Sequence, residues 1–199
     1  MKFISKKFRP LKYYAIGNKT ISVTVSLKDA SVSVESEILD LNIGDTFTII
    51  ATTVPDDLDV TYVLDDSGVV IVDNSGVVTA LKEGITSIVV KVGGDGIYAE
   101  NSTTVTATVN KVDTLVTLSY NASAKEVVVG LYSIDGLGLS STPVSVNIGG
   151  MNYIVKTNSH GMASLSVANL TPSSYVVFAS YVGNNRFNPT NTTDEIIIQ

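Results

Sequence analysis

From residue 31 onward the chain consists of short runs in which apolar side chains either alternate with polar ones or stand together. In the run from Thr46 to Thr53, Phe47 and Ile49 alternate with threonines. This predicts a strand with those two side chains turned inward and the threonines outward. Residues that form tight turns separate the runs, as at Gly149-Gly150. No convincing helix pattern occurs, so the chain is predicted to be all-β.

The predicted strands fall into two sets, one on each side of a short joint at Lys111-Val112-Asp113-Thr114. The first set is Ser31 to Glu35, Ile38 to Leu41, Thr46 to Thr53, Val60 to Leu64, Val69 to Val72, Gly76 to Ala80, Thr86 to Val92 and Thr103 to Val109. The second set is Leu115 to Tyr120, Glu126 to Ser133, Val144 to Ile148, Met151 to Thr157, Ala163 to Val167, Tyr175 to Tyr181 and Glu195 to Ile198. Short strands at this spacing indicate two β-sandwiches. Because the joint contains neither Gly nor Pro, we expect a semi-rigid line of domains.

A peptide that occurs three times marks the domain boundaries. An aromatic residue precedes a Thr by six positions in each copy, and both lead into a final strand: Tyr14 to Thr20, Tyr98 to Thr104 and Phe187 to Thr193. The copies are 84 and then 89 residues apart, which is a domain-sized period. We therefore expect domains at residues 29–111 and 112–199. Residues 1–28 are expected to be the tail of an upstream repeat or an extra edge strand, with Thr20 to Leu27 as a strand.

Composition narrows the function. The net charge is −6, and five of the 13 basic residues lie in the first twelve positions: Lys2, Lys6, Lys7, Arg9 and Lys12. The chain after residue 12 is therefore strongly acidic and repels nucleic acid, so we expect no nucleic-acid partner. No apolar run approaches the length of a membrane helix, and the basic start lacks the apolar stretch of a signal peptide. With no Cys, the chain has neither a disulfide nor a thiolate metal site.

The residues that could carry chemistry are few. The single His, His160, lies in the predicted turn Asn158-Ser159-His160-Gly161, where a structural role is favoured over a catalytic triad. Asp56, Asp57 and Asp59 share one loop, and Asp65 with Asp66 share another. Such carboxylates could bind calcium, but Asp is also typical of solvated turns and no EF-hand pattern is present. We therefore predict no catalytic residue, no metal site and no cofactor.

The sequence also contains candidate sites for glycosylation, sugar binding and covalent cross-linking. Sequons for N-glycosylation occur at Asn18, Asn101, Asn121, Asn169 and Asn191, and would matter in a glycosylating export pathway. There is no Trp to serve as a sugar platform, although exposed tyrosines could do so; Tyr13, Tyr14, Tyr98 and Tyr153 are the candidates. Lys28, Lys91 and Lys125 are candidates for Lys–Asn isopeptide cross-links, without a matched Asn and acid. The Gly93-Gly94-Asp95-Gly96 run opens no helix, so we interpret it as a hairpin loop equivalent to Gly183-Asn184-Asn185.

The first domain resembles the bacterial-type immunoglobulin-like repeat of group two. The resemblance is carried by Ile43-Gly44-Asp45-Thr46, by Pro55, and by the element from Asp73 to Gly84, Asp-Asn-Ser-Gly-Val-Val-Thr-Ala-Leu-Lys-Glu-Gly. It covers about 80 residues. Tyr62 stands where the family usually has a core Trp, and its hydroxyl needs a partner or water.

The second domain is similar to an immunoglobulin-like repeat of surface adhesin-like proteins in methanogenic archaea and of bacterial cell-surface proteins. The matching segments are Pro143 to Ile148, Thr157 to Ala163, Leu170 to Tyr175 and Tyr181 to Pro189. Together the two resemblances imply an extracellular, non-enzymatic stalk segment of a cell-surface adhesin-like protein. The implied partners are neighbouring repeats and a cell-surface glycan or protein, and we expect a monomer without membrane contact in this segment.

Three alternatives remain. The chain could be an ancillary module of a secreted carbohydrate- or cell-wall-active enzyme, a lectin-like domain that binds glycan directly, or a decoration of a phage tail or capsid. A sandwich fold alone does not distinguish these functions.

Overall fold

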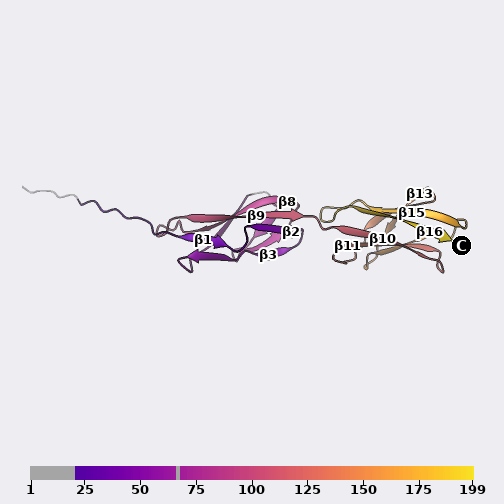
Figure 1. Ribbon diagram of the computed structural model, residues 1–199, viewed down its shortest axis with the longest axis horizontal. Coiled ribbons are helices and arrows are strands. Elements are labelled where there is room, and N and C mark those ends of the chain that lie inside the picture. The colour runs from indigo at the N-terminus through magenta and orange to yellow at the C-terminus, as the bar shows by residue number, and fades with distance from the viewer. Residues whose placement is uncertain (1–20, 66–67) are drawn as a thin grey trace, which may run out of the picture.

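A computed structural model of the protein describes residues 21–65 and 68–199, and every helix or strand assigned in this part is a strand. The strands build two β-sandwiches that lie end to end along the long axis of the molecule (Figure 1). Residues 21–27 lead away from the first sandwich, at the end opposite the second. The fold is therefore all-β, with two tandem immunoglobulin-like sandwiches.

Among the described residues, the first sandwich has nine strands. They are β1 (Ser31–Val34), β2 (Ile38–Asn42), β3 (Thr46–Thr48), β4 (Ala51–Val54), β5 (Thr61–Leu64), β6 (Val70–Val72), β7 (Val77–Ala80), β8 (Gly84–Val92) and β9 (Asn101–Asn110). One layer has the order β2-β9-β8-β5, with β2 parallel to β9 and the other neighbours antiparallel. The two-stranded sheet β1-β4 and the three-stranded sheet β3-β7-β6 form the other layer of the sandwich. Alternate side chains of these strands enclose one core, centred on Val78, Ile88, Val90 and Val105, all fully buried.

The second sandwich contains seven strands. They are β10 (Thr114–Asn121), β11 (Glu126–Ser133), β12 (Pro143–Ile148), β13 (Met151–Lys156), β14 (Met162–Ser166), β15 (Ser173–Tyr181) and β16 (Thr190–Ile198). The sheets β10-β11-β14 and β13-β12-β15-β16 are antiparallel throughout. Between them lies a second core, in which Val127, Leu131, Val144 and Ile148 are fully buried. The Gly149-Gly150 pair makes the predicted two-residue hairpin, because Ile148 and Met151 are directly opposite each other.

One predicted strand is wrong in its continuity. The run from Thr46 to Thr53 is divided into β3 and β4, which pair with different partners, β7 and β1. At the break, the Ile49 amide donates to the Gly76 carbonyl and the Ile50 carbonyl accepts from the Glu35 amide. Ile49 is buried as predicted, whereas Phe47 keeps 37% of its surface exposed although it stands directly opposite the buried Val78. The predicted single strand is divided here because the chain changes its pairing partner between the two residues.

The predicted strand from Thr20 to Leu27 is also wrong for the part that is described. Residues 21–27 form no strand, and Ile21, Val23 and Val25 are exposed. Only Lys28 makes an isolated parallel bridge, to Tyr98. The first copy of the repeated peptide, the basic residues 2–12 and Asp66 lie outside the described residues.

Candidate functional site

The candidate functional site is the joint between the two sandwiches. β9 ends at Asn110 and β10 begins at Thr114, so the chain passes from strand to strand. Between them, the Val112 amide donates to the Arg186 carbonyl over 2.9 Å, and the Asn188 amide donates to the Val112 carbonyl over 2.9 Å. Val112 is buried and forms a parallel bridge with Phe187. The joint is therefore fastened along its backbone to the loop between β15 and β16.

Side chains of the same loop hold the joint further. The Asn188 side-chain amide donates to the Asp113 carboxylate over 2.8 Å, and its backbone carbonyl accepts the Thr114 hydroxyl over 2.7 Å. The two bonds of Asn188 hold Asp113 and Thr114, the end of the joint that enters the second sandwich. Each bond contributes about 1 kcal/mol, so this end of the joint keeps a fixed position on the second sandwich.

Arg186 reaches from the second sandwich to the first. Its guanidinium lies against Gly44, in the turn between β2 and β3, and a Cβ at residue 44 would be 3.0 Å from the Arg186 Nη2 atom. Gly44 has φ +101°, which favours glycine for a second, independent reason. The guanidinium also lies 5.4 Å from the centre of the Phe187 ring, within range of a cation–π contact. Because residue 44 has no side chain, the guanidinium can lie close to the backbone of the first sandwich.

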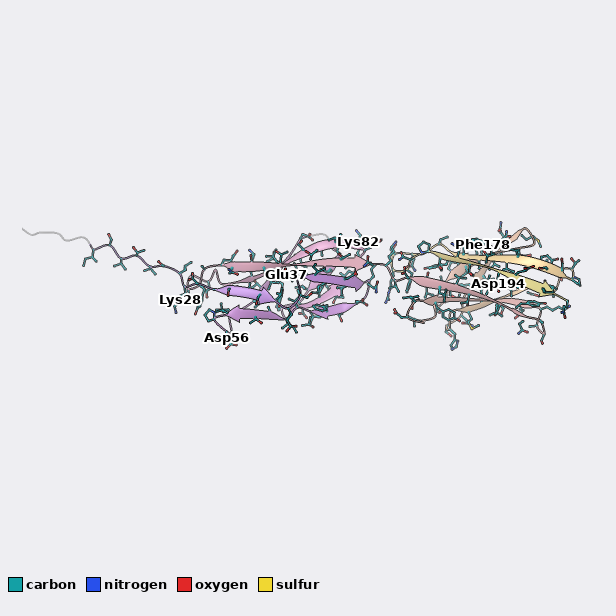
Figure 2. The ribbon with its side chains drawn as sticks, in the orientation of Figure 1. Lys28, Glu37, Asp56, Lys82, Phe178 and Asp194 are labelled. Carbon is teal, nitrogen blue, oxygen red and sulfur yellow. The ribbon has the colours of Figure 1, made fainter. Side chains whose placement is uncertain are left out.

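An ion pair links the start of the joint to the first sandwich. The Lys111 ammonium lies 3.5 Å from the Glu83 carboxylate, and both side chains are partly solvated, so the pair contributes little to stability. Lys111 and Glu83, with Leu81, Lys82 and Asn185, line an open depression of about 380 Å³. Figure 2 shows Lys82 at the end of the first sandwich that faces the second. The depression is a groove of the joint with few apolar walls, unlike an enclosed ligand pocket.

The opposite end of the first sandwich repeats the arrangement of the joint. The Lys28 amide donates to the Ile97 carbonyl and its carbonyl accepts from the Ala99 amide, both over 2.8 Å. Asp95 accepts from the Ile97 and Tyr98 amides over 2.8 Å, as Asn184 accepts from the Arg186 and Phe187 amides over 2.8 and 2.9 Å. These backbone donors lower the pKa of Asp95 below its ordinary value of 3.8. The predicted equivalence of the two loops is therefore confirmed.

His160 lies where the sequence predicts, in the turn between β13 and β14. Asn158 makes that turn, because its side-chain oxygen accepts from the His160 and Met162 amides over 2.9 and 3.1 Å. The imidazole is exposed, and its described contact is with the adjacent Ser159 hydroxyl at 3.3 Å from Nδ1. A hydroxyl of the next residue does not orient a ring for proton transfer as a buried carboxylate does.

The acidic residues considered for calcium are spread out. Asp57 and Asp59 line a shallow depression of about 240 Å³ together with Asp95, which already accepts two backbone amides. The Asp65 carboxylate accepts a hydrogen bond from the Thr86 hydroxyl over 2.5 Å, and Asp65 takes part in a further interaction besides this one. Within residues 21–65 and 68–199, no three His, Cys, Asp or Glu side chains gather closely enough to hold a metal ion.

The other surface candidates are also dispersed. Lys91 pairs with Glu100 at 3.1 Å, and Lys28 lies 5.6 Å from the centre of the Tyr98 ring. Tyr153 is half-buried against the second core. Asn101, Asn121, Asn169 and Asn191, the described sequon residues, are all exposed. Figure 2 shows Asp56 at the end of the first sandwich near Lys28.

An exposed aromatic residue that the sequence did not single out is Phe178, on the outer face of the second sandwich (Figure 2). The residue is 41% exposed and stands directly opposite Asn147 on β12 and Thr193 on β16. Asn147 donates to the Asn152 side chain over 2.7 Å, so a row of two amides, a ring and a hydroxyl crosses the sheet. The signal that could have found it is alternation along β15, which turns Val177 and Ala179 inward and residue 178 outward.

No protein-family model matches this sequence, and no curated protein matches it. Among solved structures, a bacterial ice-binding adhesin studied for host cell surface retention is similar, at 16% identity and TM-score 0.37; the match covers 87% of this chain and 66% of that one. The chain thus spans about two thirds of that adhesin structure. Titin domains z1z2 in complex with telethonin match at 14% identity and TM-score 0.40 (88% and 98% covered). Domains 5–6 of the S-layer protein SbsC match at 14% identity and TM-score 0.31 (84% and 97% covered). These low values carry no function to this chain.

In the part of the chain that the structure describes, no helix is long and apolar enough to cross a lipid bilayer.

Proposed function

We propose that this chain is a non-catalytic stalk segment of an extracellular, cell-surface adhesin-like protein, and that it spaces or presents binding regions carried elsewhere. The observation that carries the proposal is the fastened joint, in which strands β9 and β10 continue into each other through Val112. A spacer must keep its length, and three connecting residues with backbone bonds to a neighbouring loop keep it better than a loose tether.

The direction of the strands supports the same function. Strands β9 and β16, which close the two sandwiches, run along the long axis of the molecule (Figure 1). Ladder hydrogen bonds are perpendicular to their strands, so tension along the axis loads many of them at once in shear. β9 is paired along its length with β8 and over its second half with β2, which places the strand leading to the joint in the middle of its sheet.

The proposed partners follow from this geometry. Neighbouring repeats of the same protein contact the two ends, and the chain is otherwise a monomer. The resemblance to repeats of methanogen and bacterial surface proteins supports the surface location. The segment carries out no reaction of its own, and a glycan or protein of another surface is the target of the whole assembly.

Small-angle X-ray scattering of the full chain tests the spacer function. We expect one narrow maximal dimension, that of two sandwiches in line, and a broader distribution when Arg186 and Asn188 are both changed to Ala. The double substitution Ser119→Ala and Ser166→Ala, at exposed positions toward the end of the second sandwich opposite the joint, is the control. Scattering from the unchanged chain that requires two freely reorienting sandwiches would contradict the proposal.

A second function, an ancillary module of a carbohydrate- or cell-wall-active enzyme, is favoured by Phe178. An exposed ring flanked by amide and hydroxyl groups is the kind of surface on which a neutral sugar ring can stack and form hydrogen bonds. Binding to a glycan array or to peptidoglycan fragments that is lost in Phe178→Ala, and retained in Val176→Ala on the same strand face, would establish it. If the unchanged chain binds no glycan, the second function is excluded and the spacer function stands as the single proposal.

A further inference from the structure

Residues 21–27 present a row of apolar side chains to solvent. Ile21, Val23 and Val25 are 76%, 80% and 88% exposed, and polar residues separate them. Alternation with a period of two is the pattern of a strand with one buried face. Three adjacent β-branched side chains that stay this exposed would lose the hydrophobic stabilisation of about 1.5–3 kcal/mol that each gains in a core.

The hydrogen bonds of Lys28 show which strand this segment corresponds to. The Lys28 amide donates to the Ile97 carbonyl, and the Lys28 carbonyl accepts from the Ala99 amide. Val112 makes the same pair of backbone bonds with Arg186 and Asn188 in the equivalent loop of the second sandwich. Both residues also form a parallel bridge to the loop aromatic, Tyr98 or Phe187. Lys28 therefore occupies, at the outer end of the first sandwich, the position that Val112 occupies at the joint.

Counting back from these two anchors aligns the segment with β9. Val25, Val23 and Ile21 correspond to Val109, Ala107 and Val105, whose exposed fractions are 1%, 0% and 0%. The same offset of 84 residues relates Tyr14 to Tyr98. The exposed row thus has the register of a strand whose counterpart is completely buried between two sheets.

We propose that residues 21–26 are the closing strand of another immunoglobulin-like sandwich, which lies ahead of the first one and whose end rests on Ile97 and Tyr98. This inference rests on the proposed stalk function and names the partner at one end of the segment. In that sandwich the strand pairs on both sides, as β9 pairs with β2 and β8. Ile97, which is 56% exposed, is then covered by a turn of the preceding sandwich, as Arg186 meets Gly44 at the joint.

A second copy of this chain is a poorer partner for the segment. Both described sandwiches already contain their closing strands, β9 and β16, so neither has the gap that residues 21–26 fit. Lys28 is bonded to the loop at residues 97–99, which places the end of the segment directly at the outer end of the first sandwich. The partner must therefore sit in line with the chain.

The experiment supplies the missing sandwich from the chain's own sequence. In a chimera, a second copy of residues 29–97 replaces residues 1–13, so that residue 97 of the copy is followed by Tyr14 as it is normally followed by Tyr98. Hydrogen exchange followed by mass spectrometry then compares residues 21–26 in the chimera and in the unchanged chain. We expect at least hundredfold slower exchange in the chimera, and a third cooperatively folding sandwich.

Matched substitutions make the result specific. Val23→Lys puts a charge in the core of the added sandwich and should abolish the protection, whereas Thr24→Lys, on the outward face, should keep it. Val23 is larger than Ala107, so the chimera is also made with Val23→Ala, which removes any overpacking. Rapid exchange in both the Val23 and the Val23→Ala chimeras would overturn the proposal. So would slow exchange of residues 21–26 in a dimer of the unchanged chain. Neither outcome affects the scattering test of the spacer.

Discussion

At the scale of single residues, Gly76 and Tyr62 show how the first sandwich closes one end of its core. Tyr62 stands on β5, and its ring lies over Gly76, where a Cβ would be 2.5 Å from the tyrosine Oη atom and 2.9 Å from the Ile49 carbonyl oxygen. Burial, and secondarily the charge of Asp73, raise the pKa of Tyr62. The aromatic residue, the glycine and the turn at Asp73 therefore form one packed unit, although they were separate features of the sequence.

The first prediction concerns Gly76. Gly76→Ala must place a methyl group in occupied space at φ +81°, and we expect it to lower the unfolding free energy by about 3 kcal/mol. Gly96→Ala is the control, since its φ is +85° and no atom lies within 4 Å of the new methyl group; it should cost about 1 kcal/mol. Urea denaturation measures both. Equal costs for the two substitutions would show that Tyr62 does not press on Gly76.

The second prediction concerns Tyr181. Its hydroxyl is buried, burial raises its pKa, and the oxygen has no hydrogen-bond partner among the described residues. Tyr181→Phe removes a desolvated polar group and should raise the unfolding free energy by about 1 kcal/mol. Tyr175→Phe is the matched control, because the Tyr175 hydroxyl donates to the Thr171 carbonyl over 3.0 Å; it should lower the unfolding free energy by about 0.5 kcal/mol. A loss of stability in Tyr181→Phe would show that the hydroxyl is satisfied.

At the scale of elements, the loops at Asp95 and Asn184 perform the same task with different chemistry. Each side-chain oxygen accepts two backbone amides and so shapes the loop that receives the incoming chain at Lys28 or Val112. Local turn chemistry of this kind is visible in sequence, and both loops were predicted correctly. The division between β3 and β4 was not predicted, because it depends on which strands lie beside residues 46–54 in space.

The third prediction is a pH dependence confined to one loop. The folded pKa of Asp95 is lowered, so its contribution to stability is complete above pH 3.8 and is lost as the pH falls through the folded pKa. We expect the loop at residues 95–98 to lose amide protection in that acid range, while the loop held by neutral Asn184 keeps it. Hydrogen exchange in one sample compares the two. Asp95→Asn should make the first loop behave like the second, and an unchanged acid response in that variant would contradict the assignment.

At the scale of the whole molecule, the two sandwiches have separate cores and meet at the joint and at the contact of Arg186 with Gly44. The residues of each core cluster come from one side of Lys111 alone, and Val112 is buried outside both clusters. Relative orientation and internal stability should therefore be separable properties. In a spacer, the joint sets the relative orientation of the sandwiches, and each sandwich supplies its own stability.

The fourth prediction uses this separation. Two glycines inserted between Asn110 and Lys111 add up to about 7 Å of flexible chain and release the first sandwich from the Arg186 contact. We expect the distance distribution from X-ray scattering to broaden, while calorimetry shows each sandwich unfolding within about 2 °C of its original temperature. The same insertion between Asn121 and Ala122, in the turn between β10 and β11, should leave the distribution narrow. A large fall in both unfolding temperatures would mean that the sandwiches are one cooperative unit.

Apolar alternation and turn chemistry in the sequence specified most of the strands, the tight turns and the all-β class, because these depend on neighbours within a few residues. The tertiary structure decided the break between β3 and β4, the exposure of Phe47 and Phe178, and the contact of Arg186 with Gly44. It also left Ile21, Val23 and Val25 without cover among the described residues. Each of these depends on which segment, distant in sequence, comes to lie alongside, and a linear pattern of apolar and polar residues does not contain that information.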